Sequence, residues 1–279
     1  MEFKPETIDL IDKAKRILAV QTEPISIRGL YYQLISLPKD PIEPGERSYK
    51  RVIRAMTKAR EEHIIPWDAF SDKTRRIIAP NGWEDIKQYT SELPHYYRRD
   101  RLQTQEQHLE LWVEKEALTH LFEPYAYQFG ITVRVGRGYN SGSALNEFAK
   151  KAREEYRPIK ILYFGDWDPS GLDIDRSFDE KLMDNFDTYV EVERVSLTEN
   201  DIAVLPHNPV RVDDTRAEKY KAKYGDKTWE LDALTNKQIK ERIADAIYQN
   251  IDFDLFQKEL GKEEEERSKF IELLRGLEI

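Results

Sequence analysis

The second part of the chain alternates short apolar segments with helical ones, and this alternation constrains the fold more than any other feature. Strands that alternate with helices form a mostly parallel sheet covered on both faces. The apolar, strand-like segments are Leu109–Val113, Ile131–Val135, Ile159–Phe164 and Tyr189–Val195. Between them lie segments with helical spacing of apolar residues, Lys115–Phe129, Ser143–Tyr156 and Ser170–Phe186. We therefore predict an α/β domain over residues 108–214.

Residues 1–78 have a different pattern, of three short helices followed by two short strands. Helical spacing begins near Ile8, again at Ser26 and again at Ser48, with breaks rich in proline between. Two short strand-like runs follow, Ile64–Ile65 and Arg76–Ile78. Three helices with a two-stranded wing are typical of a winged helix, a form of the helix-turn-helix. We predict a winged-helix DNA-binding domain here.

The remaining segments are harder to interpret. Residues 79–107 have no clear period and include the run Tyr96-Tyr-Arg-Arg-Asp-Arg101, so we expect a linker that is also able to touch nucleic acid. Residues 215–279 are charged and helical, and we expect them to pack on the α/β domain as an extension. A chain of 279 residues suits two domains.

Composition excludes several classes of protein. The chain has no cysteine, which excludes disulfides, thiolate metal sites and a cysteine nucleophile, so any metal must be held by oxygen or histidine ligands. No stretch approaches the roughly 20 apolar residues of a membrane span, and the N-terminus lacks the order of a signal peptide. We expect a soluble cytoplasmic protein.

Charge is distributed unevenly along this chain of net charge −9. Residues 1–105 carry 19 basic against 16 acidic residues, and within residues 47–76 the count is nine against four. Local charge governs contact with DNA more than the net charge does. The basic stretch therefore favours DNA as a partner, although an ordinary solvated basic helix would have the same composition.

Three carboxylates follow the predicted strands. Glu114 comes directly after the first strand, and Asp166 and Asp168 come after the third. The carboxyl ends of parallel strands are where open α/β sheets bind ligands. Residues two apart in extended backbone point the same way, so Asp166 and Asp168 can share a metal, and carboxylates favour Mg²⁺ or Mn²⁺. Each acid alone could instead cap a helix or lie at a solvated strand end.

These residues also carry a resemblance. The segments Val113-Glu-Lys-Glu-Ala117, Gly136-Arg-Gly-Tyr139 and Asp166-Trp-Asp-Pro-Ser-Gly171 resemble the Toprim domain, a Rossmann-like fold, of the topoisomerase VI A subunit. That family includes the transesterase that makes meiotic double-strand breaks, and short relatives called mini-A, which this chain resembles most in length. The resemblance implies that Glu114, Asp166 and Asp168 bind Mg²⁺.

The loop at Gly136 departs from the family pattern, which usually has Lys between the glycines and Pro after the Tyr. Here these positions hold Arg137 and Asn140. Arg137 keeps the charge and can contact a phosphate with two hydrogen bonds, so we expect it to bind DNA. The glycines on their own are equally consistent with a plain strand-to-helix turn.

A candidate nucleophile lies in the second helix. Helical phase puts Tyr31 on the apolar face and Tyr32 on an exposed flank, next to Arg28 at the i, i+4 spacing. A guanidinium there could stabilise a tyrosinate or the attacked phosphate. The segment Arg28-Gly-Leu-Tyr-Tyr32 also resembles the family's Arg-x-x-Tyr-Tyr motif, whose second Tyr forms the 5′-phosphotyrosyl link. The alternative is that Tyr32 only packs or touches the DNA backbone.

The third helix has a basic face. Its basic residues recur at i, i+4, i+7 and i+11, opposite Val52, Ala55, Met56 and Ala59; they are Arg47, Arg51, Arg54 and Lys58. In a winged helix the third helix usually enters the major groove, so we expect these residues to bind phosphates in a salt-dependent way. Alternatively they pair with acids of a second copy of the chain.

Together these features predict a metal-dependent, DNA-cleaving transesterase that acts as a homodimer on double-stranded DNA. By the family's arrangement, Tyr32 of one subunit would attack a phosphodiester at the metal of the other, and Glu114 could relay a proton to the leaving oxygen. No Walker loop is present, so ATP-driven strand passage would need a separate ATPase subunit. The alternatives are a hydrolytic Toprim nuclease without a covalent intermediate and a non-cleaving DNA-binding protein with a vestigial metal site.

Overall fold

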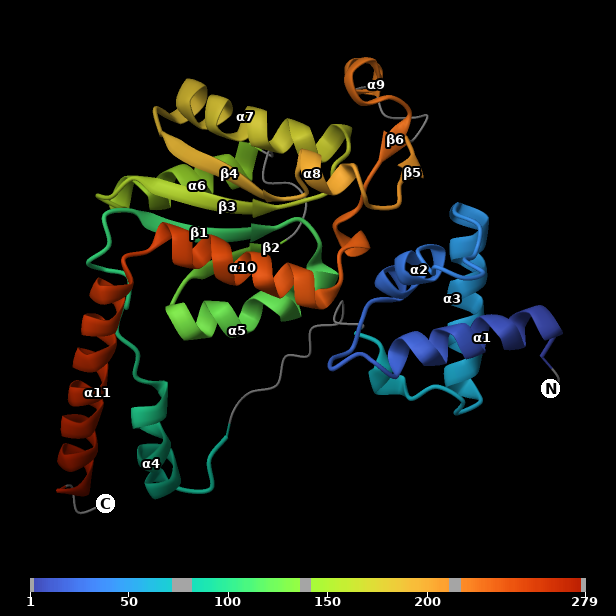
Figure 1. Cartoon of the computed structure of the whole chain (residues 1–279). Coiled ribbons are helices and arrows are strands. Elements are labelled where there is room, and N and C mark those ends of the chain that lie inside the picture. The colour runs from blue at the N-terminus through green and yellow to red at the C-terminus, as the bar shows by residue number, and fades with distance from the viewer. Residues whose placement is uncertain (1–2, 72–81, 136–141, 211–216, 277–279) are drawn as a thin grey trace.

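The computed structural model describes residues 3–71, 82–135, 142–210 and 217–276 (Figure 1). One parallel sheet with helices on both of its faces makes up the larger part of the molecule, and the N-terminal helices lie beside it. No helix within these ranges is both long and apolar enough to cross a membrane.

The sheet has four parallel strands, as the alternation predicts. These are β1 (His108–Val113), β2 (Thr132–Val135), β3 (Ile159–Phe164) and β4 (Val190–Ser196), in the order β2-β1-β3-β4. Their limits agree with the predicted ones to within one residue. The prediction of an α/β fold with a parallel sheet is therefore confirmed, and this sheet is compatible with a Rossmann-like fold.

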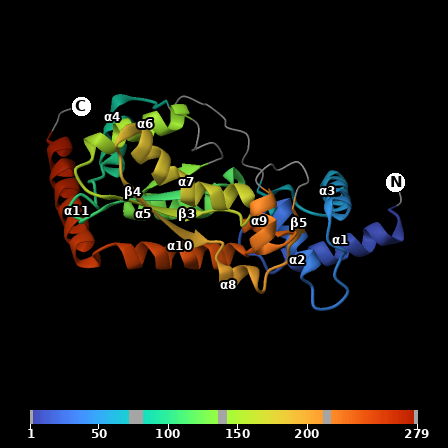
Figure 2. The same cartoon turned by 90° about the horizontal axis from the view of Figure 1, so that it is seen from above.

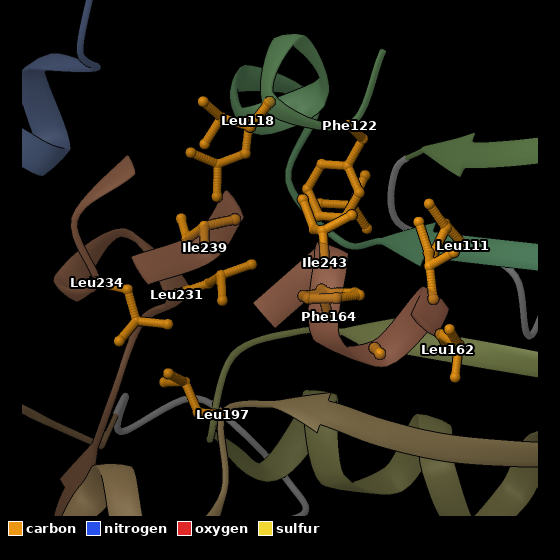
Figure 3. Packing of buried hydrophobic residues seen from close by; sticks show 14 of the residues in the cluster. Leu111, Leu118, Phe122, Leu162, Phe164, Leu197, Leu231, Leu234, Ile239 and Ile243 are labelled. Atoms are coloured by element: carbon orange, nitrogen blue, oxygen red, sulfur yellow. The ribbon is translucent and has the colours of Figure 1, made fainter. Parts of the chain in front are cut away.

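Alternation along each strand supplies the two faces of the sheet. On one face Leu111 and Phe164 pack against α5 (Thr119–Phe129) and α10 (Asn236–Asn250), as Figure 3 shows for Phe122 and Ile243. On the other face Trp112 packs against α6 (Gly142–Glu154) and α7 (Pro169–Phe186). A helix from the C-terminal region thus completes one layer of the α/β domain.

The N-terminal helices enclose a hydrophobic core of their own. They are α1 (Pro5–Leu18), α2 (Ile27–Ile35) and α3 (Glu46–Glu61), followed by the short helix η1 (Trp67–Ala69). The buried residues of this core all lie between Leu10 and Phe70. Three helices are as predicted, and we refer to residues 3–71 as the N-terminal unit.

The wing of the predicted winged helix is not confirmed. Ile64 and Ile65 form a turn after α3 and not a strand, because their backbone amides bond back to the carbonyl of Ala59. The other predicted wing strand, Arg76–Ile78, lies outside the described residues. Phe70 instead makes a single parallel bridge with Ile25.

The predicted linker is more ordered than its lack of period suggests. It contains α4 (Ile86–Tyr96), which packs beside α11 (Phe253–Arg275). Arg99 and Arg101 then form ion pairs with the buried carboxylates of Glu259 (2.9 Å) and Glu263 (2.7 Å). These two ion pairs attach the segment that follows α4 to α11. Ion pairs of this kind leave no periodic pattern in the sequence.

Short elements join the sheet to the N-terminal unit. After β4 come α8 (Glu199–Ile202), the two-stranded pair β5 (Asn208–Pro209) and β6 (Lys227–Thr228), α9 (Ala217–Tyr224) and η3 (Leu231–Ala233), whereas η2 (Glu116–Leu118) follows β1. Seen from above, α9 and β5 lie between the sheet and the N-terminal unit (Figure 2). Trp229 pairs with Trp167 through two backbone hydrogen bonds, which attaches this region to the carboxyl end of β3.

Candidate functional site

Strand register brings Glu114 and Asp166 together. Val113 and Phe164 are the last residues of neighbouring strands and pair in register. The Glu114 amide donates to the carbonyl of Phe164 at 2.9 Å, and the Asp166 amide donates to Glu114 Oε2 at 3.0 Å. Both carboxylates are buried. Two of the three acids expected at this edge of the sheet therefore lie side by side.

In this structure Asp168 caps a helix. Its carboxylate caps the N-terminus of α7 by accepting a hydrogen bond from the Gly171 amide at 2.6 Å. Within the part of the chain that the structure describes, no group of three or more His, Asp or Glu side chains is placed to hold a metal ion. Helix capping, which the sequence left open for a single acid, is what the Asp168 side chain does.

The turn that presents Asp166 depends on a close backbone approach. A Cβ atom on Gly171 would lie 2.2 Å from the carbonyl oxygen of Asp166. The Arg194 guanidinium braces the same turn, donating to the carbonyl oxygens of Gly165 (3.2 Å), Asp166 (3.3 Å) and Gly171 (2.8 Å). Glycine at position 171 therefore lets the turn fold tightly, and Arg194 fixes it.

Lys115 forms ion pairs with three of the carboxylates at this site. Its ammonium Nζ lies 3.2 Å from Asp166 Oδ1, 2.9 Å from Glu230 Oε2 and 2.6 Å from Asp232 Oδ2. Asp166 Oδ1 also accepts a hydrogen bond from the Leu231 amide at 2.7 Å. We call the four carboxylates and two cations that meet here the charged cluster: Glu114, Asp166, Glu230, Asp232, Lys115 and Arg28.

Burial and charge shift the pKa values in this cluster in opposite directions. Burial raises the pKa of the Asp166 carboxyl above its ordinary value, and the nearby carboxylates of Glu114 and Glu230 add to the rise against the effect of Lys115. Burial also acts to raise the pKa of Glu230, but Lys115 and Arg28 outweigh it and lower that pKa to about 2. Glu230 therefore stays charged.

The donor chemistry of the cluster fits a hard divalent cation. Carboxylate oxygens are the ligands that Mg²⁺ and Mn²⁺ prefer, and four carboxyls against two cations leave the cluster with surplus negative charge. In this structure the Lys115 ammonium lies against Asp166. Lys115 thus supplies a positive charge beside Asp166 in this structure.

Tyr32 and Arg28 lie at the edge of the same cluster. Arg28 donates to Glu230 through Nε at 2.8 Å and through a second, shorter bond from its terminal nitrogen, and its guanidinium lies 5.8 Å from the centre of the Tyr32 ring. The Asn208 side-chain amide donates to the Tyr32 hydroxyl. The predicted proximity of Arg28 and Tyr32 is confirmed. Glu230 of the charged cluster also lies beside them, bonded to Arg28 and Asn208.

The predicted exposure of Tyr32 is wrong. Its side chain is 1% exposed, as buried as that of Tyr31. The helical phase does put Tyr32 on a flank of α2, but Asn208 and Glu230 cover that flank. Burial raises the pKa of the Tyr32 phenol well above its ordinary value, and the charge of Glu230 raises it further, while Arg28 opposes the rise. In this conformation the phenol is protonated and shielded.

The basic face of α3 has the predicted form. Val52, Ala55, Met56 and Ala59 are buried, whereas Arg47, Arg51 and Arg54 are exposed. Lys58 is half-buried, with its ammonium 4.6 Å from the centre of the Phe3 ring. Arg137, the other residue expected to bind DNA, lies outside the described residues.

Sequence reasoning missed Lys115, Asn208, Glu230 and Asp232. Lys115 stands inside the motif that drew attention to Glu114, and its position next to a strand-end acid was the available signal. The run Trp229-Glu-Leu-Asp232 alternates apolar and acidic residues, which in extended backbone places both acids on one side. No pattern connects that run to β3, because the connection is the long-range bridge between Trp167 and Trp229.

Known proteins give no independent identification of this site. No family model matches the chain, and the search of curated proteins finds no significant match.

Proposed function

We propose that this chain cleaves double-stranded DNA by transesterification, with Tyr32 as the nucleophile. The observation that carries the proposal is that one chain contains both halves of such a site: the Tyr32 hydroxyl with the Arg28 guanidinium on α2, and the strand-end acids, which they contact through Asn208 and Glu230. In phosphoryl-transfer chemistry a phenol can act as the nucleophile, a guanidinium can stabilise the charge on the phosphate, and carboxylates can bind a metal or transfer protons. The resemblance to the topoisomerase VI A family, and to its short mini-A members, supports the same assignment.

In the proposed reaction the phenolic oxygen of Tyr32 attacks phosphorus and the bond from phosphorus to the 3′-oxygen breaks. The phenol loses its proton as it attacks, and Glu114 would relay a proton to the departing 3′-oxygen. The product is a 5′-phosphotyrosyl link and a free 3′-hydroxyl. Arg28 and Lys115 offset the charge of the attacked phosphate. Mg²⁺ or Mn²⁺ held by Glu114, Asp166 and Asp168 would supply further charge compensation. Binding it would require Lys115 to move away from Asp166, and Asp168 to release the Gly171 amide.

DNA would bind along the basic face of α3. Arg47, Arg51 and Arg54 are exposed there, and Arg137 would add a further phosphate contact. Two copies of the chain, each supplying one Tyr32 to the acids of the other, would cut both strands. A separate ATPase subunit would be needed for strand passage, and the cytoplasm, with the nucleoid as the target, is the expected location.

The test is to incubate supercoiled DNA with the protein and Mg²⁺ or Mn²⁺, denature the mixture and examine the DNA ends. We expect linear DNA with protein attached to its 5′ ends. Tyr32→Phe should abolish these adducts, whereas Tyr31→Phe, which removes only a hydroxyl bonded to the backbone of Gly45, should retain them. Adducts that persist in Tyr32→Phe would disprove the assignment of the nucleophile.

Burial of Tyr32 favours a second candidate, a hydrolytic nuclease of the Toprim type. In that reaction water attacks the phosphodiester and Tyr32 is structural. The same experiment distinguishes the two, because hydrolysis gives linear DNA with protein-free ends in both the wild type and Tyr32→Phe. The Lys115 ammonium against Asp166 favours a third, a DNA-binding protein that never cuts, which would yield no linear product with either metal.

A further inference from the structure

The contact between the N-terminal unit and the rest of the chain is mainly polar. The hydrophobic core of the unit lies within Leu10–Phe70, and among the described residues the only apolar side chain from outside that packs against it is Ala233, partly buried. The contact is made instead by paired polar groups, which we call the polar interface: Arg28 with Glu230, Ser26 with Asp232 at 2.8 Å, and Tyr32 with Asn208. Small polar contacts between separate cores allow two parts of a chain to move apart.

The polar interface and the proposed reaction exclude each other sterically. A phosphodiester of double-stranded DNA cannot reach a phenol that is 1% exposed and hydrogen-bonded to Asn208. Within the N-terminal unit itself, Tyr32 contacts Tyr31 edge to face. Its outer side is covered by Asn208 and Glu230, which belong to the other part of the chain.

We infer that the structure is a closed, autoinhibited state, in which the polar interface holds the N-terminal unit over the charged cluster and must open before Tyr32 can meet DNA. That this closed state inhibits cleavage rests on the proposed function. Opening of the polar interface is a property of the fold and can be measured without cleavage. Lys115 is central to it, because its ammonium bridges Asp166, on the sheet side, to Glu230 and Asp232, which bind Arg28 and Ser26. Any group that draws Lys115 or Arg28 away weakens the whole contact.

Chemical nitration of tyrosines measures this opening without reference to cleavage. Tyr31 and Tyr32 are both 1% exposed, but Tyr31 is enclosed by its own unit, where its hydroxyl accepts a hydrogen bond from the Gly45 amide at 2.7 Å. Detachment of the unit therefore exposes Tyr32 alone, whereas unfolding exposes both. Tyr156 and Tyr189, which are 83% and 67% exposed, report the reactivity of free phenols.

Glu230→Gln is the variant that weakens the polar interface, because it removes the charge that Arg28 and Lys115 share. We expect nitration of Tyr32, located by mass spectrometry, to become faster by roughly tenfold or more, with Tyr31 still protected. Glu147→Gln makes the same chemical change in an exposed pair with Lys151 and should leave both rates as in the wild type. Unchanged nitration of Tyr32 in Glu230→Gln, or equal acceleration at Tyr31, would overturn the inference.

A reversible cross-link tests the same state in the other direction. The chain has no cysteine, so Glu23→Cys with Lys240→Cys, at an ion pair between the two parts, introduces a unique thiol pair. Joining these thiols with a short linker attached through disulfides should suppress nitration of Tyr32 in the Glu230→Gln background, and reduction followed by desalting should restore it. Rapid nitration of Tyr32 in the cross-linked protein would contradict the closed state.

The two proposals fail in different ways. If no form of the protein yields adducts or cut DNA, the proposed function fails, and the nitration rates still decide whether the unit opens. If adducts form equally well with and without the cross-link, the closed state is not inhibitory, and the inference fails while the cleavage function stands. Adducts that disappear on cross-linking and return on reduction support both.

Discussion

The Lys115 ammonium lies 3.2 Å from Asp166 Oδ1, in the position where a strand-end acid of this kind would meet a cation. Burial would disfavour the charge on Lys115, but the carboxylates of Asp166 and Asp232 outweigh it and hold the pKa of Lys115 well above its ordinary value. Lys115 is thus a permanent cation that links the sheet to η3. Its removal should therefore affect stability.

Lys115→Met should destabilise the protein by about 3 kcal/mol, because it leaves the buried carboxylates of Asp166 and Asp232 without their counter-charge. We expect this loss in the free energy of unfolding measured by urea denaturation. Lys151→Met removes an exposed ammonium from a pair on α6 and serves as the matched control, with a change of less than about 1 kcal/mol. A loss no greater in Lys115→Met than in the control would show that the ion pairs at Asp166 contribute little.

Gly171→Ala should disrupt the turn that carries Asp166. The added Cβ atom would lie 2.2 Å from a backbone oxygen, which cannot move aside as a flexible side chain can. We expect a loss of at least about 2 kcal/mol in unfolding free energy. Gly261→Ala is the matched control, because its Cβ would meet nothing within 4 Å and alanine is favoured over glycine by about 1 kcal/mol in a helix such as α11. Equal stability of the two variants would contradict the close approach at Gly171.

The sheet could be predicted from the sequence because its signals are local. Each strand from β1 to β4 is rich in apolar or β-branched residues, which alternate with charged ones in β4, and parallel pairing follows from the helices between the strands. The meeting of Glu114 with Asp166 follows in turn, since both come directly after neighbouring strands.

The rest of the site depends on contacts between residues far apart in the chain. Tyr32 has the helical phase of an exposed residue, yet Asn208, 176 positions away, covers it. Nothing in the sequence around Tyr32 or around Asn208 indicates that these two residues are in contact. Similarly, α10 is visible as an amphipathic helix, but its place in a layer beside α5 is set by the shape of the core that Phe122 and Ile243 share.

Acid should weaken the protein partly through Glu110, a buried acid of β1 whose carboxylate binds Arg134 at 2.6 Å. Burial acts to raise the pKa of Glu110, but hydrogen bonds from His108 and Arg134 outweigh it and lower that pKa to about 2. Because the folded pKa lies below the unfolded one, this stabilisation is present above the ordinary pKa of a glutamate and is lost as the pH falls through about 2.

Glu110→Gln should therefore flatten the dependence of stability on pH at the acidic end. Between pH 6 and pH 2 we expect the wild type to lose about 3 kcal/mol more unfolding free energy than the variant does, measured by urea denaturation across that range. Glu147→Gln, an exposed acid paired with Lys151, should follow the wild-type curve. Parallel curves for Glu110→Gln and the wild type would show that Glu110 titrates normally.

The exposed arginines of α3 should determine affinity for DNA without affecting the fold. Arg47, Arg51 and Arg54 point away from the buried face formed by Val52 and its neighbours, so replacing all three with Ala should leave the unfolding free energy nearly unchanged. If each arginine neutralises one phosphate, the slope of the logarithm of affinity against the logarithm of salt concentration should fall in magnitude by roughly 3. Lys237→Ala, at an exposed position on α10, should leave the slope as in the wild type. A wild-type slope in the triple variant would mean that DNA binds to another face, whereas the expected loss would place the duplex along α3, on the same unit as Tyr32.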